Sequence, residues 1–194
     1  MWEERYAAEE YAYGKQANDF LAEQVSQLPK GRVLCLAEGE GRNAVFLAQH
    51  GYDVVAVDSS IAGMKKAQNL AAQNNVEIET VVADLAQFSF LPDSYDAVVS
   101  IFCHLPVLLR QKVHRQVVSA LKPGGVFLLE AYTPDQLKFK TGGPPVSELT
   151  VVQDDLLEEI HGLEVLYSAE IEREVKEGLY HTGMGAVVQL VARK

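Results

Sequence analysis

From residue 32 onward, the sequence alternates between short apolar runs and longer stretches with helical periodicity. Short runs without a polar face are typical of strands that are buried on both sides of a sheet. We predict such strands at residues 32–36, 54–57, 78–82, 95–100 and 126–129, with helices at 43–50, 59–74 and 106–121 between them. This alternation predicts an α/β fold with a mostly parallel sheet and right-handed crossovers.

The two ends of the chain depart from this alternation. Residues 3–27 place Phe20, Leu21 and Val25 on one face of a predicted long helix. Residues 163–175 and 179–192 are predicted as long strands, and the three residues between them can join only antiparallel strands. A short acidic helix is predicted at 154–160. We expect one domain over residues 1–194, with a leading helical lid segment at 1–28 and a core at 31–194.

The composition excludes several classes of protein. The formal net charge is −10, and tight nucleic-acid binding needs Lys and Arg to neutralise phosphates, so DNA and RNA are disfavoured as partners. No window approaches roughly 18 consecutive apolar residues, and the charged first residues lack the apolar core of a signal peptide. Cys35 and Cys103 have no CxxC spacing and are expected as buried free thiols. We therefore expect a cytoplasmic protein without a membrane partner.

The first predicted strand runs into a glycine turn at residues 37–43. Glycines two residues apart at such a turn let the backbone pass close to a ligand, and the following helix offers unpaired N–H groups. The pattern Gly39-x-Gly41-x-x-Ala44 also fits the dinucleotide-binding fingerprint. The turn therefore predicts a nucleotide-bearing ligand, and a tight turn without a ligand is the alternative.

Two acids follow the next two predicted strands. Asp58 lies 19 residues after Gly39, where a carboxylate can accept hydrogen bonds from both ribose hydroxyls. It can instead cap the next helix, although Ser59 and Ser60 compete for that role. Asp84 follows the third strand and can accept a hydrogen bond from an adenine amino group, or serve only as a turn residue. Open α/β sheets bind ligands at the carboxyl ends of their strands, where all three features fall.

The order of these features along the chain resembles the class I S-adenosylmethionine-dependent methyltransferases. The matching features are the glycine turn, Asp58, Asp84, the strand at 95–100, the Leu-Lys-Pro-Gly-Gly turn at 121–125 and the terminal hairpin. The resemblance covers almost the whole chain. It implies a Rossmann-like doubly wound sheet of seven strands in the order 3-2-1-4-5-7-6, with the last strand antiparallel. It also implies S-adenosyl-L-methionine as the cofactor, with the glycines at its amino-acid side, Asp58 at the ribose and Asp84 at the adenine. The predicted cofactor-binding residues are Tyr13, Glu38, Gly39, Gly41, Asn43, Asp58, Ser59, Asp84, Leu85 and Ile101.

Within this class, three segments resemble the tellurite-resistance-type methyltransferases: residues 41–43, residues 104–106, and the N-terminal residues 11–14 with 18–20. The chain also departs from the class. Cys35 stands where an acid is common and Ala37 where glycine is common. Either Glu38 compensates for the missing acid, or the methionine end of the cofactor is held differently.

The candidate catalytic residue is His104, after the fourth predicted strand, where it can orient or deprotonate an acceptor. It can also serve only to bond the next helix. Cys103 is expected to pack rather than react, and Tyr13 either closes over the cofactor or packs in the core. His181 is expected as an exposed turn residue, with the wall of the acceptor site as the alternative. The spacing of the His, Cys and acidic residues shows no metal-ligand cluster.

These features predict a methyltransferase that acts on a small-molecule acceptor, because little chain remains for a separate recognition domain. The resemblance does not name the acceptor or an oligomeric state. The glycine pattern and Asp58 also allow an NAD-dependent oxidoreductase, although the terminal hairpin disfavours it. Cys35 and Ala37 leave open a third class, a module that binds S-adenosylmethionine without catalysis.

Overall fold

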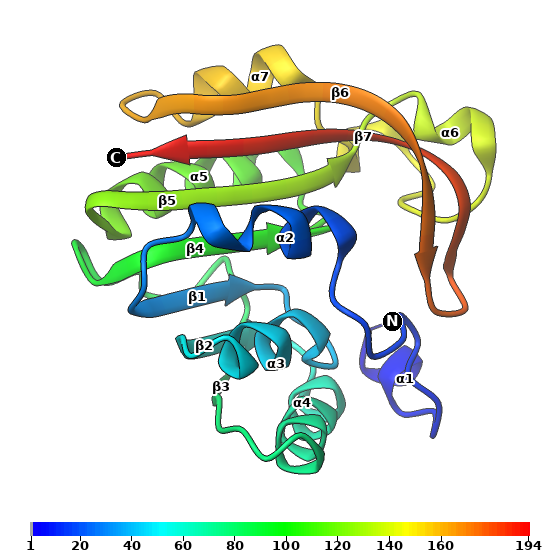
Figure 1. The fold of residues 1–194 in the computed structure, drawn as a ribbon. Helices are drawn as coiled ribbons and strands as arrows, with labels where there is room; N and C mark the ends of the chain where they lie inside the picture. The colour runs from blue at the N-terminus through cyan, green and yellow to red at the C-terminus, as the bar shows by residue number, and fades with distance from the viewer. Residues whose placement is uncertain (1) are drawn as a thin grey trace.

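A computed structural model, which describes residues 2–194, contains one seven-stranded sheet (Figure 1). The strands are β1 (Arg32–Leu36), β2 (Asp53–Asp58), β3 (Glu79–Val82), β4 (Tyr95–Ile101), β5 (Leu121–Tyr132), β6 (Glu164–Glu177) and β7 (His181–Arg193). They lie in the order β3-β2-β1-β4-β5-β7-β6, and β7 runs antiparallel to both β5 and β6. The predicted fold class is thereby confirmed, including the strand order and the antiparallel last strand.

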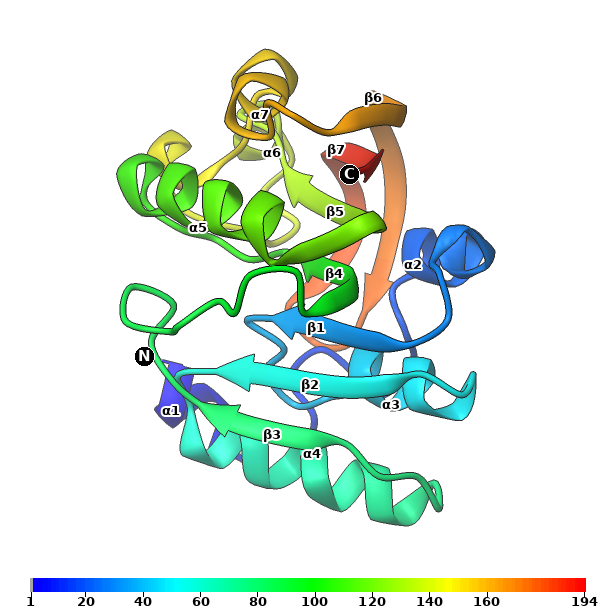
Figure 2. The same cartoon turned by 90° about the vertical axis from the view of Figure 1, so that its left-hand side faces the viewer.

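Helices cover both faces of the sheet (Figure 2). They are α1 (Trp2–Tyr6), α2 (Asp19–Gln24), α3 (Arg42–Gln49), α4 (Ile61–Gln73), α5 (Val107–Ala120), α6 (Gln136–Phe139) and α7 (Gln153–Glu159), with 3-10 turns at Val25–Gln27 and Ser147–Leu149. The helices α2, α3 and α4 pack on one face, and α5 and α7 pack on the other.

The central strands β1 and β4 are mostly apolar because each face of the sheet has its own core. In β1, Leu34 and Leu36 point into the core under α5 and α7. Val33 and Cys35 alternate with them and point into the core under α2, α3 and α4. Because these strands are buried on both faces, their ends are held in place. The polar loops that follow the strands carry residues of the candidate site.

The single long helix predicted at residues 3–27 is wrong. Residues 7–18 between α1 and α2 are not helical, and Gly14 within them has a φ of +72°. Their backbone bonds to distant segments instead: the Ala12 N–H donates to Glu40 Oε2 at 2.8 Å, and the Ala12 carbonyl accepts from Leu179 N–H at 2.9 Å. Asn18 then starts α2 by accepting from Leu21 N–H.

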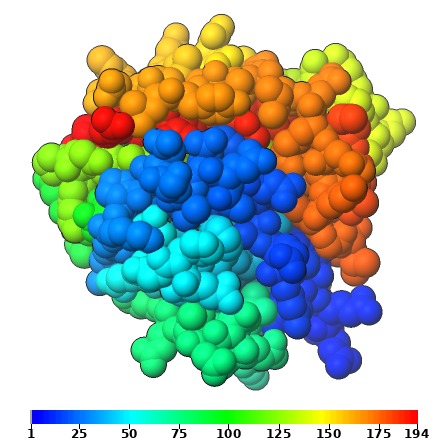
Figure 3. Space-filling view, viewed as in Figure 1, coloured from blue at the N-terminus to red at the C-terminus, as the bar shows by residue number. Residues whose placement is uncertain are grey.

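We call residues 2–18 the N-terminal strap. It lies beside the tip of the β6–β7 hairpin and also contacts α4 (Figures 1 and 3). Figure 3 shows the strap, in dark blue, between the green helix α4 and the orange hairpin. The strap thus connects α4 with the tip of the β6–β7 hairpin, and it crosses the region where the carboxyl ends of the central strands lie.

Candidate functional site

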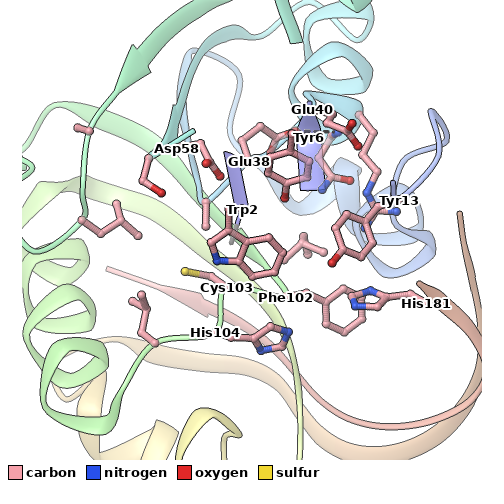
Figure 4. Close-up of a pocket in the computed structure, with 18 of the residues that line it drawn as sticks. Trp2, Tyr6, Tyr13, Glu38, Glu40, Asp58, Phe102, Cys103, His104 and His181 are labelled. Atoms are coloured by element: carbon pink, nitrogen blue, oxygen red, sulfur yellow. Dashed lines mark hydrogen bonds between the residues drawn. The ribbon is translucent and has the colours of Figure 1, made fainter. Parts of the chain in front are cut away.

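A cavity of about 210 Å³ lies between the carboxyl ends of β1, β2 and β4 and the strap (Figure 4). Nine of the eleven residues predicted for the site line it: Tyr13, Glu38, Asn43, Asp58, Ser59, Asp84, Leu85, Ile101 and His104. Cavities that hold drug-sized ligands usually measure about 300–1,000 Å³, so this one is small with the strap in place.

The two glycines of the turn do not line the cavity, and each has a packing role. Gly39 has a φ of +62°, and a Cβ there would lie 2.7 Å from the Tyr6 hydroxyl. Gly41 has a φ of +90°, and a Cβ there would lie 2.5 Å from the Cβ of Ala67 in α4. The predicted contact of these glycines with the cofactor stays a prediction.

Glu38 occupies the amino-terminal end of α3. Its Oε1 accepts from the N–H groups of Asn43 at 2.9 Å and Ala44 at 2.8 Å. Burial raises the pKa of this carboxyl to about 7, although the two amides favour its charged form. The preceding Ala37 adopts a left-handed φ of +49°, a conformation that glycine would adopt with less strain. A carboxylate therefore fills the place where a helix end could bind an anion.

Asp58 ends β2 and supports the glycine turn. Its Oδ2 accepts from Gly39 N–H at 2.9 Å, and its Oδ1 accepts from Ser60 N–H at 2.8 Å. Burial raises the pKa of the carboxyl. The helix cap of α4 is Ser60, whose hydroxyl accepts from Gly63 N–H, so Asp58 does not cap that helix. Both carboxylate oxygens keep lone pairs for a ligand in the cavity.

The carboxyl end of β3 contributes a more exposed acid. Asp84 is exposed, and its Oδ1 accepts from Ala86 N–H at 2.8 Å, as in a turn. The neighbouring Leu85 is buried and, with Ile101 of β4, gives the cavity an apolar floor. The contact of Asp84 with an adenine amino group stays a prediction.

The segment after β4 is held in an unusual backbone conformation. Phe102 has a φ of +52°, which is strained for a bulky residue by about 1–3 kcal/mol, and its N–H donates to Glu130 O at 2.8 Å. This turn directs the rings of Phe102 and His104 to the cavity wall. Cys103 lies between them, and burial raises the pKa of its thiol to about 12, as expected of a packing residue.

Two histidines line the cavity, and each has at least one buried ring nitrogen that makes no hydrogen bond. Neither ring nitrogen of His104 has a partner, and burial lowers its pKa to about 3. His181, at the start of β7, is buried rather than exposed in a turn, so that expectation is wrong. Its Nδ1 is unpaired and lies 3.6 Å from Glu177 Oε2, and burial lowers its pKa. His104 is therefore neutral near pH 7.

The strap closes the cavity with Trp2, Tyr6 and Tyr13. It is anchored on α4 by Glu3, whose carboxylate accepts from the Ser60 hydroxyl at 2.6 Å. Arg5 donates to the Tyr13 hydroxyl at 2.6 Å and lies over the rings of Trp2 and Tyr180. The strap thus contacts both α4 and the hairpin tip.

A buried polar network supports the cavity from behind. Asn18 Nδ2 donates to Glu130 Oε2 at 2.6 Å and to Glu177 Oε1 at 2.8 Å. Arg173 pairs with Glu130, and Arg42 pairs with Glu177, each at 2.6 Å. These contacts join the strap, α3, β5 and the hairpin into one unit.

The cavity has two chemically different sides. Figure 4 shows Glu38, Glu40 and Asp58 on one side of the Trp2 indole, and Phe102, His104 and His181 on the other. We call these the acidic side and the aromatic side. Among the described residues that line the cavity, Arg42 is the only Lys or Arg, and Glu177 neutralises it. Within residues 2–194, no group of three or more His, Cys or acidic residues could hold a metal ion.

Among the residues that line the cavity, the predicted site did not include Trp2, Tyr6, Glu40, Arg42 and Phe102. The aromatic clustering at the start of the chain was a signal for the first two. Nothing in the sequence marks the left-handed φ of Phe102. No described helix is long and apolar enough to cross a membrane.

The sheet order, the antiparallel β7 and a cavity at the strand ends define the class I S-adenosylmethionine-dependent methyltransferase fold. Residues 33–125 match a family described as a methyltransferase domain. This match and the fold support the resemblance of the chain to the class I S-adenosylmethionine-dependent methyltransferases that its motifs indicate, and S-adenosylmethionine is the cofactor of that class.

A demethylmenaquinone methyltransferase from Clavibacter sepedonicus is 36% identical over 104 residues, which are 53% of this chain and 42% of that protein. The chain spans less than half the length of the first curated relatives it matches. TehB from Haemophilus influenzae has a TM-score of 0.75 and 22% identity over 92% of this chain and 62% of that one. A solved structure concerning the conversion of a disulfide bond into a thioacetal group during echinomycin biosynthesis has a TM-score of 0.79 and 17% identity. The match covers 99% of this chain and 87% of that one.

Proposed function

We propose that this chain transfers a methyl group from S-adenosylmethionine to a small-molecule acceptor. The observation that carries the proposal is the hydrogen bonding of Glu38, whose carboxylate occupies the N–H groups at the start of α3. A dinucleotide would place its pyrophosphate at those N–H groups. Here the pyrophosphate would meet a carboxylate, whereas a sulfonium or ammonium cation would be attracted to it.

The rest of the acidic side supports the same ligand. When bound, S-adenosylmethionine supplies an electrophilic methyl group on a positively charged sulfur. In this proposal, Asp58 accepts hydrogen bonds from the ribose hydroxyls and Asp84 accepts one from the adenine amino group. Glu38 and Glu40 offer negative charge to the methionine end. Leu85, Ile101 and Trp2 provide apolar surface that excludes water from the reacting atoms.

His104 orients the acceptor in this proposal rather than deprotonating it. A buried imidazole with a pKa of about 3 holds almost no proton near pH 7, so it is a weak base. Its unpaired ring nitrogens can still donate one hydrogen bond and accept another. The small size of the closed cavity favours a small acceptor.

The test compares S-adenosylmethionine with NAD, using the fluorescence of Trp2, which is the only tryptophan and lines the cavity. We expect S-adenosylmethionine to bind about a hundredfold tighter, a difference of ~2.7 kcal/mol. Glu38→Ala exposes the α3 N–H groups and should narrow that difference. Glu158→Ala removes an exposed carboxylate of α7 and should leave it unchanged.

Methyl transfer is then measured by mass spectrometry, with isotopically labelled cofactor and a panel of thiols, phenols and oxyanions. Labelled product with any member supports the proposal. Equal affinity for NAD would favour the oxidoreductase instead. Tight cofactor binding without labelled product from any acceptor would favour a non-catalytic binding module.

A further inference from the structure

The aromatic side of the cavity is part of a continuous cluster of rings from distant parts of the chain. The rings of Phe102 and Tyr132 stack with centroids 4.4 Å apart, and His104 stacks on Tyr132 at 5.8 Å. His181 meets Phe102 edge-on at 5.0 Å and lies 4.5 Å from Tyr13. These rings form an aromatic wall that offers both faces and edges to a ligand.

Some imidazole nitrogens in this wall have no hydrogen-bond partner. Both nitrogens of His104 are buried and unpaired, whereas the Nδ1 of His181 makes no hydrogen bond but lies 3.6 Å from Glu177 Oε2. Buried polar atoms in folded proteins are nearly always paired, so these atoms point to a ligand that supplies the missing bonds. Figure 4 shows His104 and His181 on the same side of the cavity, with Phe102 between them.

One ring of the protein itself already lies against this space. The indole of Trp2 lies between the acidic side and the aromatic side, stacked on Tyr6 at 5.9 Å and tilted toward Tyr13 at 6.5 Å. It remains 37% exposed, so it is not locked in a core. The space next to the aromatic wall therefore accepts a flat ring.

We propose that the acceptor is a small aromatic thiol, with its ring against the aromatic wall and its sulfur hydrogen-bonded by His104. The inference rests on the proposed methyl transfer and deepens it. The thiolate lone pair forms the new bond to the methyl carbon. The bond from that carbon to the cofactor sulfur breaks, and its electron pair stays on the cofactor sulfur. The thiol proton leaves to solvent before the transfer.

The chemistry of the wall selects this nucleophile over others. A thiol with a pKa of about 8.5 ionises near neutral pH without a base, whereas a phenol at about 10 ionises far less. An aliphatic amine arrives as an ammonium ion and would need a base, which a neutral, weakly basic His104 does not provide. An aromatic amine is uncharged near pH 7, but its lone pair is delocalised into the ring and makes it a weaker nucleophile than a thiolate. The one Arg among the described lining residues is paired with Glu177, so the positive charge near any anionic acceptor comes from the cofactor sulfonium. A carboxylate is a weaker nucleophile than a thiolate toward the methyl carbon.

The first experiment tests how much the aromatic ring of the acceptor contributes to methyl transfer. Methyl transfer to 2-phenylethanethiol is compared with transfer to 2-cyclohexylethanethiol, because two methylenes keep the thiols of this pair similar in acidity. We expect kcat/KM to be about tenfold higher for the aromatic member, although the saturated ring is at least as hydrophobic. Phe102→Leu should bring the two values close together, and circular dichroism checks that this variant is folded. Trp2→Leu, at a more exposed position, provides a second variant if Phe102→Leu does not fold.

The second experiment compares the nucleophiles thiophenol, phenol and aniline with the full chain. We expect transfer to thiophenol only. A preference for the saturated thiol, for aniline or for inorganic oxyanions would contradict the proposal that the acceptor is an aromatic thiol. So would failure to methylate any aromatic thiol while the cofactor binds and another acceptor reacts. Failure of the proposed function is distinguishable, because the cofactor would then not bind or no acceptor would react.

Discussion

The two sides of the cavity are built in different ways. The acidic side comes from one continuous strand–helix–strand unit, in which Glu38 follows β1 and Asp58 ends β2. The aromatic side combines Phe102 and His104 from the segment after β4 with His181 of β7, and Tyr13 of the strap packs against His181. A local unit can therefore hold one ligand, while three distant segments shape the space for the other. Phe102, His104 and His181 lie outside the strand–helix–strand unit that carries Glu38 and Asp58, so substitutions of these three residues leave that unit intact.

The largest effect that we expect on the acidic side concerns pH. Burial raises the pKa of Glu38 from 4.5 to about 7, so the folded chain binds more protons than the unfolded chain between these values. The free energy of unfolding should fall as the pH rises from 4.5 to 7, and then level off. Relative to Glu38→Gln, the fall in the wild type should be about 3 kcal/mol. Urea unfolding of both proteins at pH 5 and pH 8 measures the difference.

Glu158→Gln is the matched control, because Glu158 is exposed on α7. It should follow the wild type at both pH values. Parallel pH dependence of the wild type and Glu38→Gln would show that burial does not set the charge of the acidic side.

A smaller effect is expected from Asp58→Ala. Loss of charge-assisted hydrogen bonds to the ribose should weaken binding of S-adenosylmethionine by about 1.5–3 kcal/mol, with no comparable change in the KM of the acceptor. Calorimetry measures the affinity, and circular dichroism checks the fold. Asp53→Ala serves as the control, because Asp53 is exposed at the opposite end of the same strand. Unchanged affinity in a folded Asp58→Ala protein would remove Asp58 from the cofactor site.

The smallest effect concerns the strap, which covers both sides. Arg5→Ala removes the bond to Tyr13 and the contacts with the rings of Trp2 and Tyr180, which should loosen the strap by about 1 kcal/mol. Amide exchange of residues 2–14 should be about fivefold faster than in the wild type without cofactor, and cofactor should slow it in both proteins. Arg115→Ala, at an exposed position on α5, is the control and should leave the amide exchange of residues 2–14 unchanged with and without cofactor.

The same measurement tests whether the strap is a lid. Lid segments belong to the least stable parts of a fold and become ordered over their ligands. Equal and strong protection of residues 5–20 with and without cofactor would identify the strap as a permanent part of the core.

Elements set by local pattern were predictable from the sequence. The ends of β1 to β4, the acids that follow two of these strands and a helix cap at Ser59 or Ser60 follow from apolar runs and turn chemistry within single strand–helix units. The predicted strand at 126–129 was too short, because β5 spans Leu121–Tyr132. The strap was not predictable, because its helical periodicity competes with hydrogen bonds to Glu40 and to the hairpin, which lie far away in sequence. His181 lies close to a turn of the chain, and only the packing of the strap and of Phe102 against it explains its burial.

The buried network around Asn18 has a consequence for the order of folding. Asn18 and Glu177 are separated by 159 residues, and Glu130 lies between them in the chain. Contacts of such long sequence separation close late, because much of the chain must be ordered before they form. On the ribosome, the central strands emerge well before the hairpin that carries Glu177 and Arg173. The cavity is therefore completed only when the hairpin has been synthesised and has docked, so a nascent chain has no finished binding site until its last strand is in place.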